Sequence, residues 1–178
     1  MPLSTLDDIR KLLAEIPGPD QTAAGQAGER EPQLTKPPGS LGRLEEISLW
    51  LCQWQGRHPP RMERPHACVF AGNHGGTARG VSAFPAEVTV QMVANFEAGG
   101  AAINQICKTF GIELNVLALD LETPTEDFTE SPAMSEGGCV EAFNRGMAVV
   151  EDGMDVLCLG EMGIGNTTAA AAICHGLY

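Results

Sequence analysis

The sequence is poor in basic residues and in long apolar runs, and each shortage excludes a class of protein. Eleven Lys and Arg residues stand against 23 Asp and Glu, which gives a net charge of −12 at pH 7. A chain this acidic repels nucleic acid and anionic lipid. No apolar run approaches the roughly 20 residues that a membrane-spanning helix needs, and the start of the chain lacks the layout of a secretory signal. We therefore expect a cytoplasmic protein with no nucleic-acid partner and no membrane partner.

Paired cysteines are also missing. The sequence has six cysteines but no C-x-x-C pair, which is the spacing typical of zinc and redox sites. Most of the six lie in apolar or helical stretches, where a thiol behaves as a small hydrophobe. We expect no disulfide framework, no bound metal and no cofactor. The cysteines are Cys52, Cys68, Cys107, Cys139, Cys158 and Cys174.

The chain is organised around a glycine-rich stretch at 155–168, DVLCLGEMGIGNTT. Its apolar start at 156–159 predicts a buried strand, and the alanines that follow the stretch predict a helix. A strand, a glycine-rich turn and a helix in this order point backbone N–H groups at an anion. Glycine suits the turn because it tolerates positive φ and lets a ligand approach the backbone. Asn166, Thr167 and Thr168 are placed to cap the helix and to donate to phosphate oxygens.

Two familiar phosphate loops fit this stretch only in part. Gly160 and Gly165 have the spacing of G-x-x-x-x-G-K-[ST], but Asn166 replaces the lysine that holds the β- and γ-phosphates. Gly163 begins a G-x-G-x-x-G pattern, but Thr168 stands at its third glycine. The pattern therefore favours a site for a single phosphate over a site for a nucleoside triphosphate.

Glu161 and His74 each allow two interpretations. The Glu161 carboxylate either accepts hydrogen bonds from the loop's own N–H groups or faces a sugar hydroxyl or a cationic ring. His74 lies among glycines after a predicted strand, at the edge where α/β proteins bind ligands. The ring either lines a site or bonds to nearby backbone, and no neighbouring carboxylate in the sequence marks it as a general base.

Polar residues at two turns are more typical of structure than of function. The stretch KPPGSLGR fits a surface turn before a helix better than a substrate contact by Lys36, Ser40 or Arg43. Asp120 closes a predicted strand and is slightly more typical of a turn residue than of a functional carboxylate.

Hydrophobic patterning predicts three strands, near residues 68, 116 and 157, with helices between them. This order predicts an α/β fold: a Rossmann-like three-layer parallel sheet with flanking helices, plus a small N-terminal helical part. We place a helical segment at 1–60 and an α/β nucleotide-binding portion at 61–178. Loops are predicted at 21–31 and 122–135, and helices at 5–16, 41–55, 85–96, 101–109 and 138–151.

Three blocks of the sequence together resemble one enzyme family. They are KPPGSLGRLEEIS at 36–48, HGGTARGVSAFPAEVTVQMVANFEAGGAAINQI at 74–106 and GEMGIGNTTAAAAI at 160–173. Each is similar to the matching block of the nicotinate-nucleotide–dimethylbenzimidazole phosphoribosyltransferase family, and the blocks occur in the family's order. The resemblance covers most of the chain from Lys36 onward.

The resemblance implies a reaction and a set of site residues. Such enzymes transfer the 5-phosphoribosyl group from nicotinate mononucleotide to 5,6-dimethylbenzimidazole, which gives nicotinate and the α-ribazole 5′-phosphate of the cobalamin lower ligand. The family is typically homodimeric and implies no metal. The glycine loop would hold the 5′-phosphate, and the stretch from Ser82 would form the benzimidazole pocket. The implied substrate-binding residues are His74, Ser82, Phe84, Gln91, Met92, Gly160, Glu161, Gly163, Gly165, Asn166, Thr167 and Thr168.

The sequence departs from the family at three points. Asn73 stands where many relatives carry aspartate, and Gly76 stands where a β-branched residue is usual. Family members are also considerably longer, and no residue here matches their C-terminal general base. The resemblance therefore leaves the catalytic residue unassigned, and Glu161 is a candidate only from its place beside the glycine loop. We expect an N-terminal portion of the enzyme, truncated at its C-terminus, with an edge or face of the sheet uncovered. The alternatives are a weak or inactive module that binds nucleotide or benzimidazole, and a hydrolase that uses His74 and Glu161.

Overall fold

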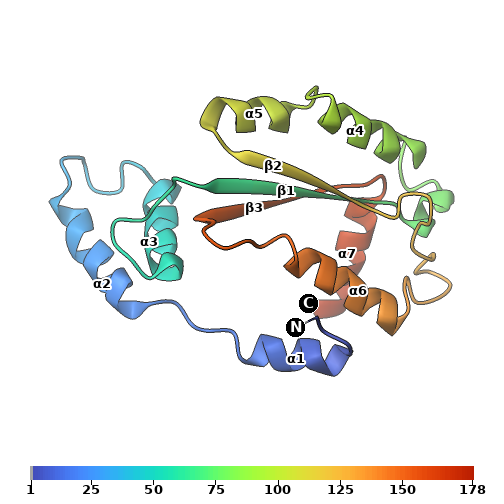
Figure 1. The fold of residues 1–178 in the computed structure, drawn as a ribbon, viewed down its shortest axis with the longest axis horizontal. Helices are drawn as coiled ribbons and strands as arrows, with labels where there is room; N and C mark the ends of the chain where they lie inside the picture. Colours follow the sequence, from blue (N-terminus) through green and yellow to red (C-terminus); the bar gives the residue numbers. More distant parts are fainter. Residues whose placement is uncertain (1) are drawn as a thin grey trace. The chain divides into compact units, whose positions relative to one another are not determined.

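The computed structural model describes residues 2–178, which divide into two compact units (Figure 1). One unit joins the start of the chain, up to Arg10, to Arg64–Tyr178, and the other is Lys11–Glu63. The start of the chain therefore folds with the α/β unit, whereas the sequence placed it in the helical segment. Two hydrogen bonds hold it there: Leu3 N donates to Asn144 Oδ1, and Asn144 Nδ2 donates to Leu3 O, both at 2.8 Å.

The larger unit is built on three parallel strands, β1 (Pro65–Gly72), β2 (Glu113–Leu119) and β3 (Val156–Met162), in the order β2-β1-β3. All three lie where the sequence predicts strands. β1 is the central strand, so its apolar run is buried, with Cys68 1% exposed and Ala71 fully covered. The predicted parallel α/β sheet is confirmed.

Helices cover both faces of this sheet (Figure 1). α4 (Glu87–Glu97) and α5 (Ala102–Phe110) lie on one face, whereas α6 (Glu136–Met147) and α7 (Asn166–Leu177) lie on the other. The connection from β1 to β2 runs one way across the sheet, and the connection from β2 to β3 runs back the other way. Because crossovers between parallel strands are right-handed, the helices of these two connections lie on opposite faces. After β1 the chain turns toward one face of the sheet, and after the neighbouring strand β3 it turns toward the other. α/β proteins bind ligands at the carboxyl ends of two such strands, in the crevice between them.

The third strand was predicted to be buried, and this prediction is wrong for its middle. Cys158 is exposed, and the Leu159 side chain is 71% exposed. Two features explain this: β3 has a neighbouring strand on one side only, and the face that carries Leu159 borders an open groove beside α6. The uncovered edge expected from the sequence is thus found.

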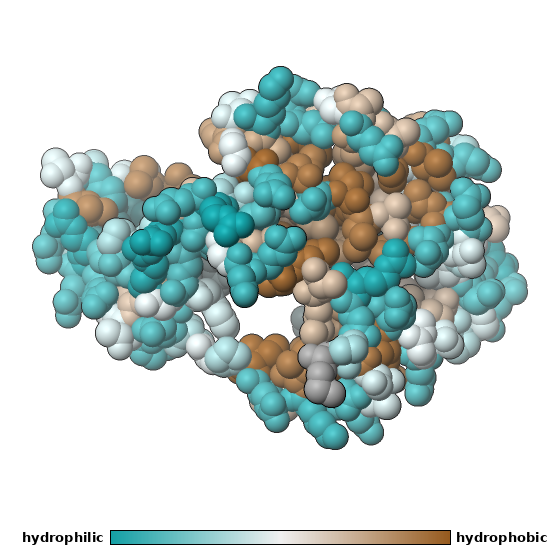
Figure 2. Space-filling view, in the orientation of Figure 1, coloured by the Kyte–Doolittle hydropathy of each residue, from teal (hydrophilic) through white to brown (hydrophobic). Residues whose placement is uncertain are grey.

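An apolar groove of about 630 Å³ runs along β3 and α6. Figure 2 shows hydrophobic side chains that reach the surface over the sheet, between the helices on its two faces. The groove is lined by Phe70, Met134, Cys139, Ala142, Phe143, Gly146, Met147, Val149, Val150, Leu157 and Leu159.

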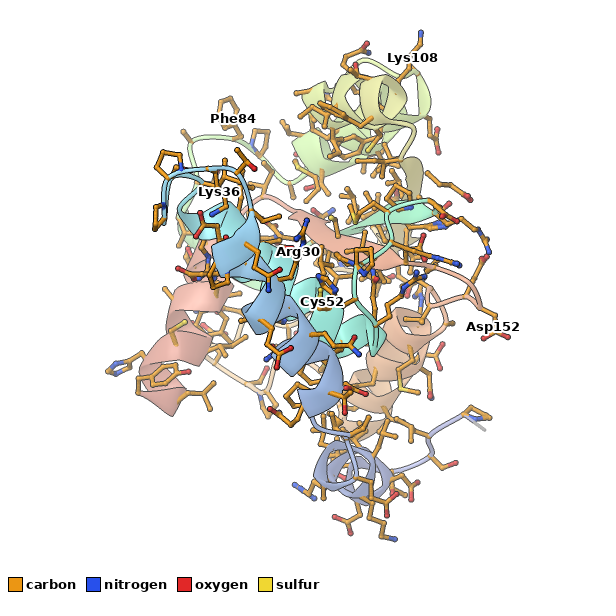
Figure 3. The ribbon with its side chains drawn as sticks, turned by 90° about the vertical axis from the view of Figure 1, so that its left-hand side faces the viewer. Arg30, Lys36, Cys52, Phe84, Lys108 and Asp152 are labelled. Atoms are coloured by element: carbon orange, nitrogen blue, oxygen red, sulfur yellow. The ribbon has the colours of Figure 1, made fainter. Side chains whose placement is uncertain are left out.

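The smaller unit holds α2 (Gln21–Arg30), a 3-10 turn η1 (Glu31–Gln33) and α3 (Arg43–Gln55), and α1 (Leu6–Ala14) crosses the division between the units. The sequence predicted a loop at 21–31, and this prediction is wrong. Asp20 caps α2, since its Oδ1 accepts a hydrogen bond from Ala23 N at 2.8 Å. α2 packs against α3, where Ala23 is 2% exposed and Cys52 1% exposed (Figure 3). The sequence prediction missed this helix because its small alanines show no apolar periodicity, although alanine favours a helix.

The turn before α3 is held by ion pairs within the same unit. Lys36 Nζ lies 2.5 Å from Glu31 Oε1 and 2.6 Å from Glu45 Oε1, and Arg43 pairs with Glu46. The hydrogen bonds that the Lys36 ammonium donates to the Glu31 and Glu45 carboxylates raise the pKa of Lys36. These contacts agree with a structural role for the turn.

Candidate functional site

The glycine loop joins the end of β3 to the start of α7. β3 ends at Met162, α7 begins at Asn166, and Gly165 between them has φ of +89°. The predicted order of strand, glycine turn and helix is confirmed. The predicted side-chain cap is not formed, because the N-cap residue is Gly165 and it has no side chain to accept a hydrogen bond. The start of α7 remains a place of partial positive charge that favours an anion.

Gly163 lies against Gly72, the last residue of β1. A Cβ atom at this position would lie 2.3 Å from the carbonyl oxygen of Gly72 and 2.3 Å from Asn166 Oδ1. Only a residue without a side chain fits between these atoms. The glycine thus lets the loop after β3 approach the end of the neighbouring strand β1.

His74 and Asn166 meet across the two loops. His74 Nε2 lies 2.5 Å from Asn166 Oδ1, although the residues are 92 positions apart. With the amide oxygen as acceptor, the imidazole donates from Nε2, and a neutral ring then keeps Nδ1 as an acceptor. The structure therefore brings a residue of the second sequence block to the glycine loop of the third.

Two threonines that sequence reasoning missed hold the middle of the glycine loop. Ile164 N donates to Thr89 Oγ1 at 3.1 Å, and Thr77 Oγ1 donates to Ile164 O at 3.2 Å. Thr89 lies in α4 and is fully buried, and Thr77 lies in the 3-10 turn η2 (Gly75–Arg79). No local pattern marks either residue, since both contacts depend on how the segments fold together.

Asn73 fixes the loop that follows β2. Its side-chain Nδ2 donates to Leu121 O at 3.0 Å, and its carbonyl oxygen accepts from Thr125 N at 3.1 Å. The side chain is buried, and among residues 2–178 its Oδ1 has no hydrogen-bond partner. Asn73 and His74 line a hollow of about 660 Å³ at the carboxyl ends of β1 and β2.

Asp120 lies at the edge of the same hollow, in an ion pair. Arg145 Nη1 donates to Asp120 Oδ2 at 2.7 Å, and Arg145 Nη2 donates to Ala118 O at 2.9 Å. Asp120 also has φ of +46°, the one positive value for a non-glycine residue in the part of the chain that the structure describes. Both observations agree with a turn residue at the end of β2.

The loop at 122–135 is attached to the 3-10 turn through Arg79. Arg79 Nε donates to Asp127 Oδ2 at 2.6 Å, and its Nη2 pairs with Glu130. Thr129 N and Oγ1 both donate to Asp127 Oδ1, at 3.0 and 2.7 Å. The Arg79 guanidinium and the Thr129 donors lower the pKa of Asp127 from 3.8 to about 2.

We expect acid to weaken this attachment in a defined range. Because the folded pKa of Asp127 is lowered, its contribution to the free energy of unfolding is present above pH 3.8 and is lost as pH falls to about 2. Urea unfolding from pH 5 downward measures the loss, and the Asp127→Asn variant should lack this component. Asp152→Asn is the control, since the Asp152 carboxylate makes no ion pair in residues 2–178. An Asp127→Asn profile parallel to that of the wild type would contradict the prediction.

The residues expected to bind the benzimidazole lie on α4 and on the segment before it, both of which contact the glycine loop through neighbouring residues. Phe84 is 62% exposed and points outward (Figure 3), and Ser82 Oγ accepts from Phe84 N at 3.2 Å. Gln91 lines a smaller hollow of about 470 Å³ that also includes Asn73. Met92 is half-buried on α4. Among these residues, Gln91 is the one that shares a hollow with the turn after β1.

Glu161 lies in β3 opposite Phe70 and is exposed. In the described part of the chain its carboxylate has no hydrogen bond or ion pair, so the bonds to the loop's own N–H groups are not seen. Gly160 is within the same strand, where a Cβ would lie 3.3 Å from Val69 Cγ2. Thr167 and Thr168 lie in the first turn of α7.

The remaining candidate chemistry is limited. Over residues 2–178, no three His, Cys, Asp or Glu side chains gather in a way that could hold a metal ion. The six cysteines are free thiols, of which Cys52, Cys68 and Cys107 are buried, and burial raises the pKa of each of these three. No helix in the described chain has the length and apolar character to cross a membrane.

Comparison with known proteins identifies relatives over almost the whole chain. A family model described as phosphoribosyltransferase matches residues 16–178. A protein of Ruegeria sp. (strain TM1040), named nicotinate-nucleotide–dimethylbenzimidazole phosphoribosyltransferase, is 58% identical over 176 residues, which are 99% of this chain and 52% of the relative. The protein of the same name from Rhizobium meliloti (strain 1021) is 59% identical over 172 residues, 97% of this chain and 51% of the relative. The chain spans about half the length of these curated relatives.

A solved structure agrees with the sequence relatives. The crystal structure of the protein of that name from Thermus thermophilus matches with a TM-score of 0.75 at 40% identity. The match covers 89% of this chain and 54% of the Thermus chain. A structure described as CobT from the same organism matches with a TM-score of 0.72, also at 40% identity, over 88% of this chain and 53% of that one.

Proposed function

Because the chain belongs to the nicotinate-nucleotide–dimethylbenzimidazole phosphoribosyltransferase family, we propose that it binds nicotinate mononucleotide for phosphoribosyl transfer to 5,6-dimethylbenzimidazole. The products are α-ribazole 5′-phosphate and nicotinate, in the synthesis of the cobalamin lower ligand. The observation that carries the proposal is the loop at 163–165, which meets the turn after β1 and opens the N-terminus of α7. Such a loop suits the 5′-phosphate of a mononucleotide.

The phosphate end of the nucleotide occupies the glycine loop in this proposal. Gly163 and Gly165 present backbone without side chains, and the first turn of α7 adds the Thr167 and Thr168 hydroxyls. His74 and Asn166, which touch each other, form one wall of the site. The proposed nucleotide-binding residues are Gly160, Glu161, Gly163, Gly165, Asn166, Thr167, Thr168 and His74.

The chemistry assigns a role to Glu161. Nicotinate leaves from a pyridinium and needs little acid assistance, while the sugar carbon gains oxocarbenium character that a nearby carboxylate stabilises. The Glu161 carboxylate lies two residues before the glycine loop, is exposed and has no ion pair among residues 2–178, so it is available for this role. The benzimidazole must lose its N–H proton to a base. We propose Ser82, Phe84, Gln91 and Met92 for the benzimidazole, since Phe84 offers an exposed ring and Met92 suits a flat aromatic.

A second candidate function is binding without turnover. It is favoured by the apolar groove along β3 and α6, which offers a surface for association. In this interpretation the chain binds nucleotide or benzimidazole and associates through its sheet edge. We propose a homodimer in the cytoplasm for either function, and six free thiols fit a reducing compartment.

The proposed function predicts nicotinate release by the 178-residue chain only when dimethylbenzimidazole is present. Chromatography of nicotinate and ribazole phosphate, with and without the base, is the measurement. Formation of both products only in the presence of dimethylbenzimidazole would establish transfer. It would also show that the chain carries a working general base. Nucleotide binding without release, weakened in Gly165→Val, would establish the binding module.

Two other results would contradict the proposal. Release of ribose 5-phosphate without benzimidazole would indicate a hydrolase that uses His74 and Glu161. Absence of any nucleotide binding would exclude the transferase, and absence of both nucleotide and benzimidazole binding would exclude the binding module as well.

A further inference from the structure

Ile164 lies at the centre of the glycine loop, and side-chain hydroxyls hold both of its backbone polar groups. Its N–H donates to Thr89 Oγ1 at 3.1 Å, and its carbonyl oxygen accepts from Thr77 Oγ1 at 3.2 Å. The two threonines come from different elements, α4 and η2, and lie 75 and 87 positions away in the sequence. The loop is thus fixed from two directions by residues outside it.

These two bonds set the orientation of the peptide units on either side of Ile164. A peptide is planar and trans, so its C=O and the following N–H point in opposite directions. When Thr77 holds Ile164 O, the N–H of Gly165 is turned to the opposite side of the loop. When Thr89 holds Ile164 N, Gly163 O is likewise turned away, and it accepts from Asn166 N at 3.1 Å at the start of α7. The hydroxyls therefore decide where the donors of the loop point.

The burial of Thr89 supports a specific role for its hydroxyl. The residue is fully buried in α4, where valine would fill the same volume. A buried hydroxyl is costly unless it forms a hydrogen bond, and here it bonds to the glycine loop. The hydroxyl is therefore compatible with its buried position only as long as Ile164 N–H lies against it.

We propose that Thr89 and Thr77 are positioning residues that orient the loop amides, the Gly165 N–H above all, toward a phosphate monoester. Neither threonine needs to touch the ligand. This role rests on the proposed function for the identity of the ligand, nicotinate mononucleotide, and it rests on the structure alone for the orientation of the loop.

The matched variants are Thr89→Val, which removes only the hydroxyl, and Thr89→Ser, which keeps it. Calorimetry with nicotinate mononucleotide and with nicotinate riboside, the same ligand without phosphate, separates the phosphate contribution from the rest. We expect Thr89→Val to bind the mononucleotide about tenfold more weakly, or worse, with little change for the riboside. Thr89→Ser should restore affinity for the mononucleotide. Thr109→Val is the control, because the Thr109 hydroxyl bonds only to Gln105 O within α5.

Amide hydrogen exchange at Ile164 tests the clamp, meaning the two threonine hydroxyls on Ile164, without any ligand. The Ile164 amide should be protected in the wild type and in Thr89→Ser and should exchange at least about tenfold faster in Thr89→Val, which loses its acceptor. If Thr89→Val does not fold, Thr77→Val and Thr77→Ser provide the affinity comparison through a half-buried residue, whose hydroxyl bonds to Ile164 O and not to the Ile164 amide. Equal mononucleotide affinity in the valine and serine variants, or equal Ile164 exchange in Thr89→Val and Thr89→Ser, would overturn the proposal.

The failure of the proposed function would look different. If the wild-type chain binds no mononucleotide but its Ile164 amide shows hydroxyl-dependent protection, the proposed ligand is wrong and the role of the two threonines in holding the loop stands. If the wild-type chain binds the mononucleotide and substitution of either threonine changes nothing, the proposed ligand stands and the positioning role of the threonines is wrong.

Discussion

Replacing Gly163 with alanine should destabilise the α/β unit and abolish measurable nicotinate mononucleotide binding. The new Cβ would lie 2.3 Å from Gly72 O and 2.3 Å from Asn166 Oδ1, well inside any contact that real Cβ atoms make. The Asn166 side chain can rotate away, but Gly72 O belongs to the backbone at the end of the central strand. The loop must therefore move away from β1, and overpacking of this kind costs about 1–3 kcal/mol or more.

Loss of binding follows from the same displacement. If the loop at 163–165 shifts, the His74 contact with Asn166 and the threonine contacts with Ile164 are disturbed together. Denaturant unfolding measures the stability change, and calorimetry measures the affinity. Gly146→Ala in α6 is the matched control, because a Cβ there meets nothing within 4 Å, and alanine in place of a helical glycine stabilises by about 0.5–1 kcal/mol. Wild-type affinity in Gly163→Ala would show that the loop tolerates the side chain.

Gly75→Ala is expected to have the second largest effect, from the other side of the site. Its Cβ would lie 2.4 Å from Thr125 O and 2.8 Å from Asp127 N, both backbone atoms of the loop after β2. Gly75 N also donates to Thr125 O at 2.8 Å, so the two segments cannot separate without losing this bond. We expect a destabilisation of about 1–3 kcal/mol and weaker mononucleotide binding, since the turn η2 carries Thr77.

The next residue provides the control. At Gly76 a Cβ would meet Phe128 Cε1 at 3.8 Å and Asp127 Oδ1 at 3.9 Å, which are ordinary contacts. Gly76→Ala should therefore leave stability within about 0.5 kcal/mol of the wild type. Equal unfolding free energies for the Gly75 and Gly76 variants would contradict the prediction.

Local patterns in the sequence predicted much of the fold. The apolar runs at β1, β2 and β3 and the helices between them gave the parallel sheet, because hydrophobic periodicity depends on neighbouring residues only. The helix α2 was missed although its signals are local, since the cap at Asp20 and the small alanines lack an apolar stripe. The exposure of β3 was misjudged for a different reason: an apolar strand can lie at the centre or at the edge, and only strand order decides which.

The candidate site divides in the same way. The sequence by itself determined that a glycine turn lies between a strand and a helix, because a backbone without side chains and a following helix N-terminus are local features. Only the tertiary structure decided three contacts: His74 pairs with Asn166, Gly163 fits against Gly72, and Thr77 and Thr89 form hydrogen bonds with Ile164. Each joins residues 75 or more positions apart along the chain. No local spacing encodes such contacts, since they form only when the carboxyl ends of β1 and β3 are brought side by side in one sheet.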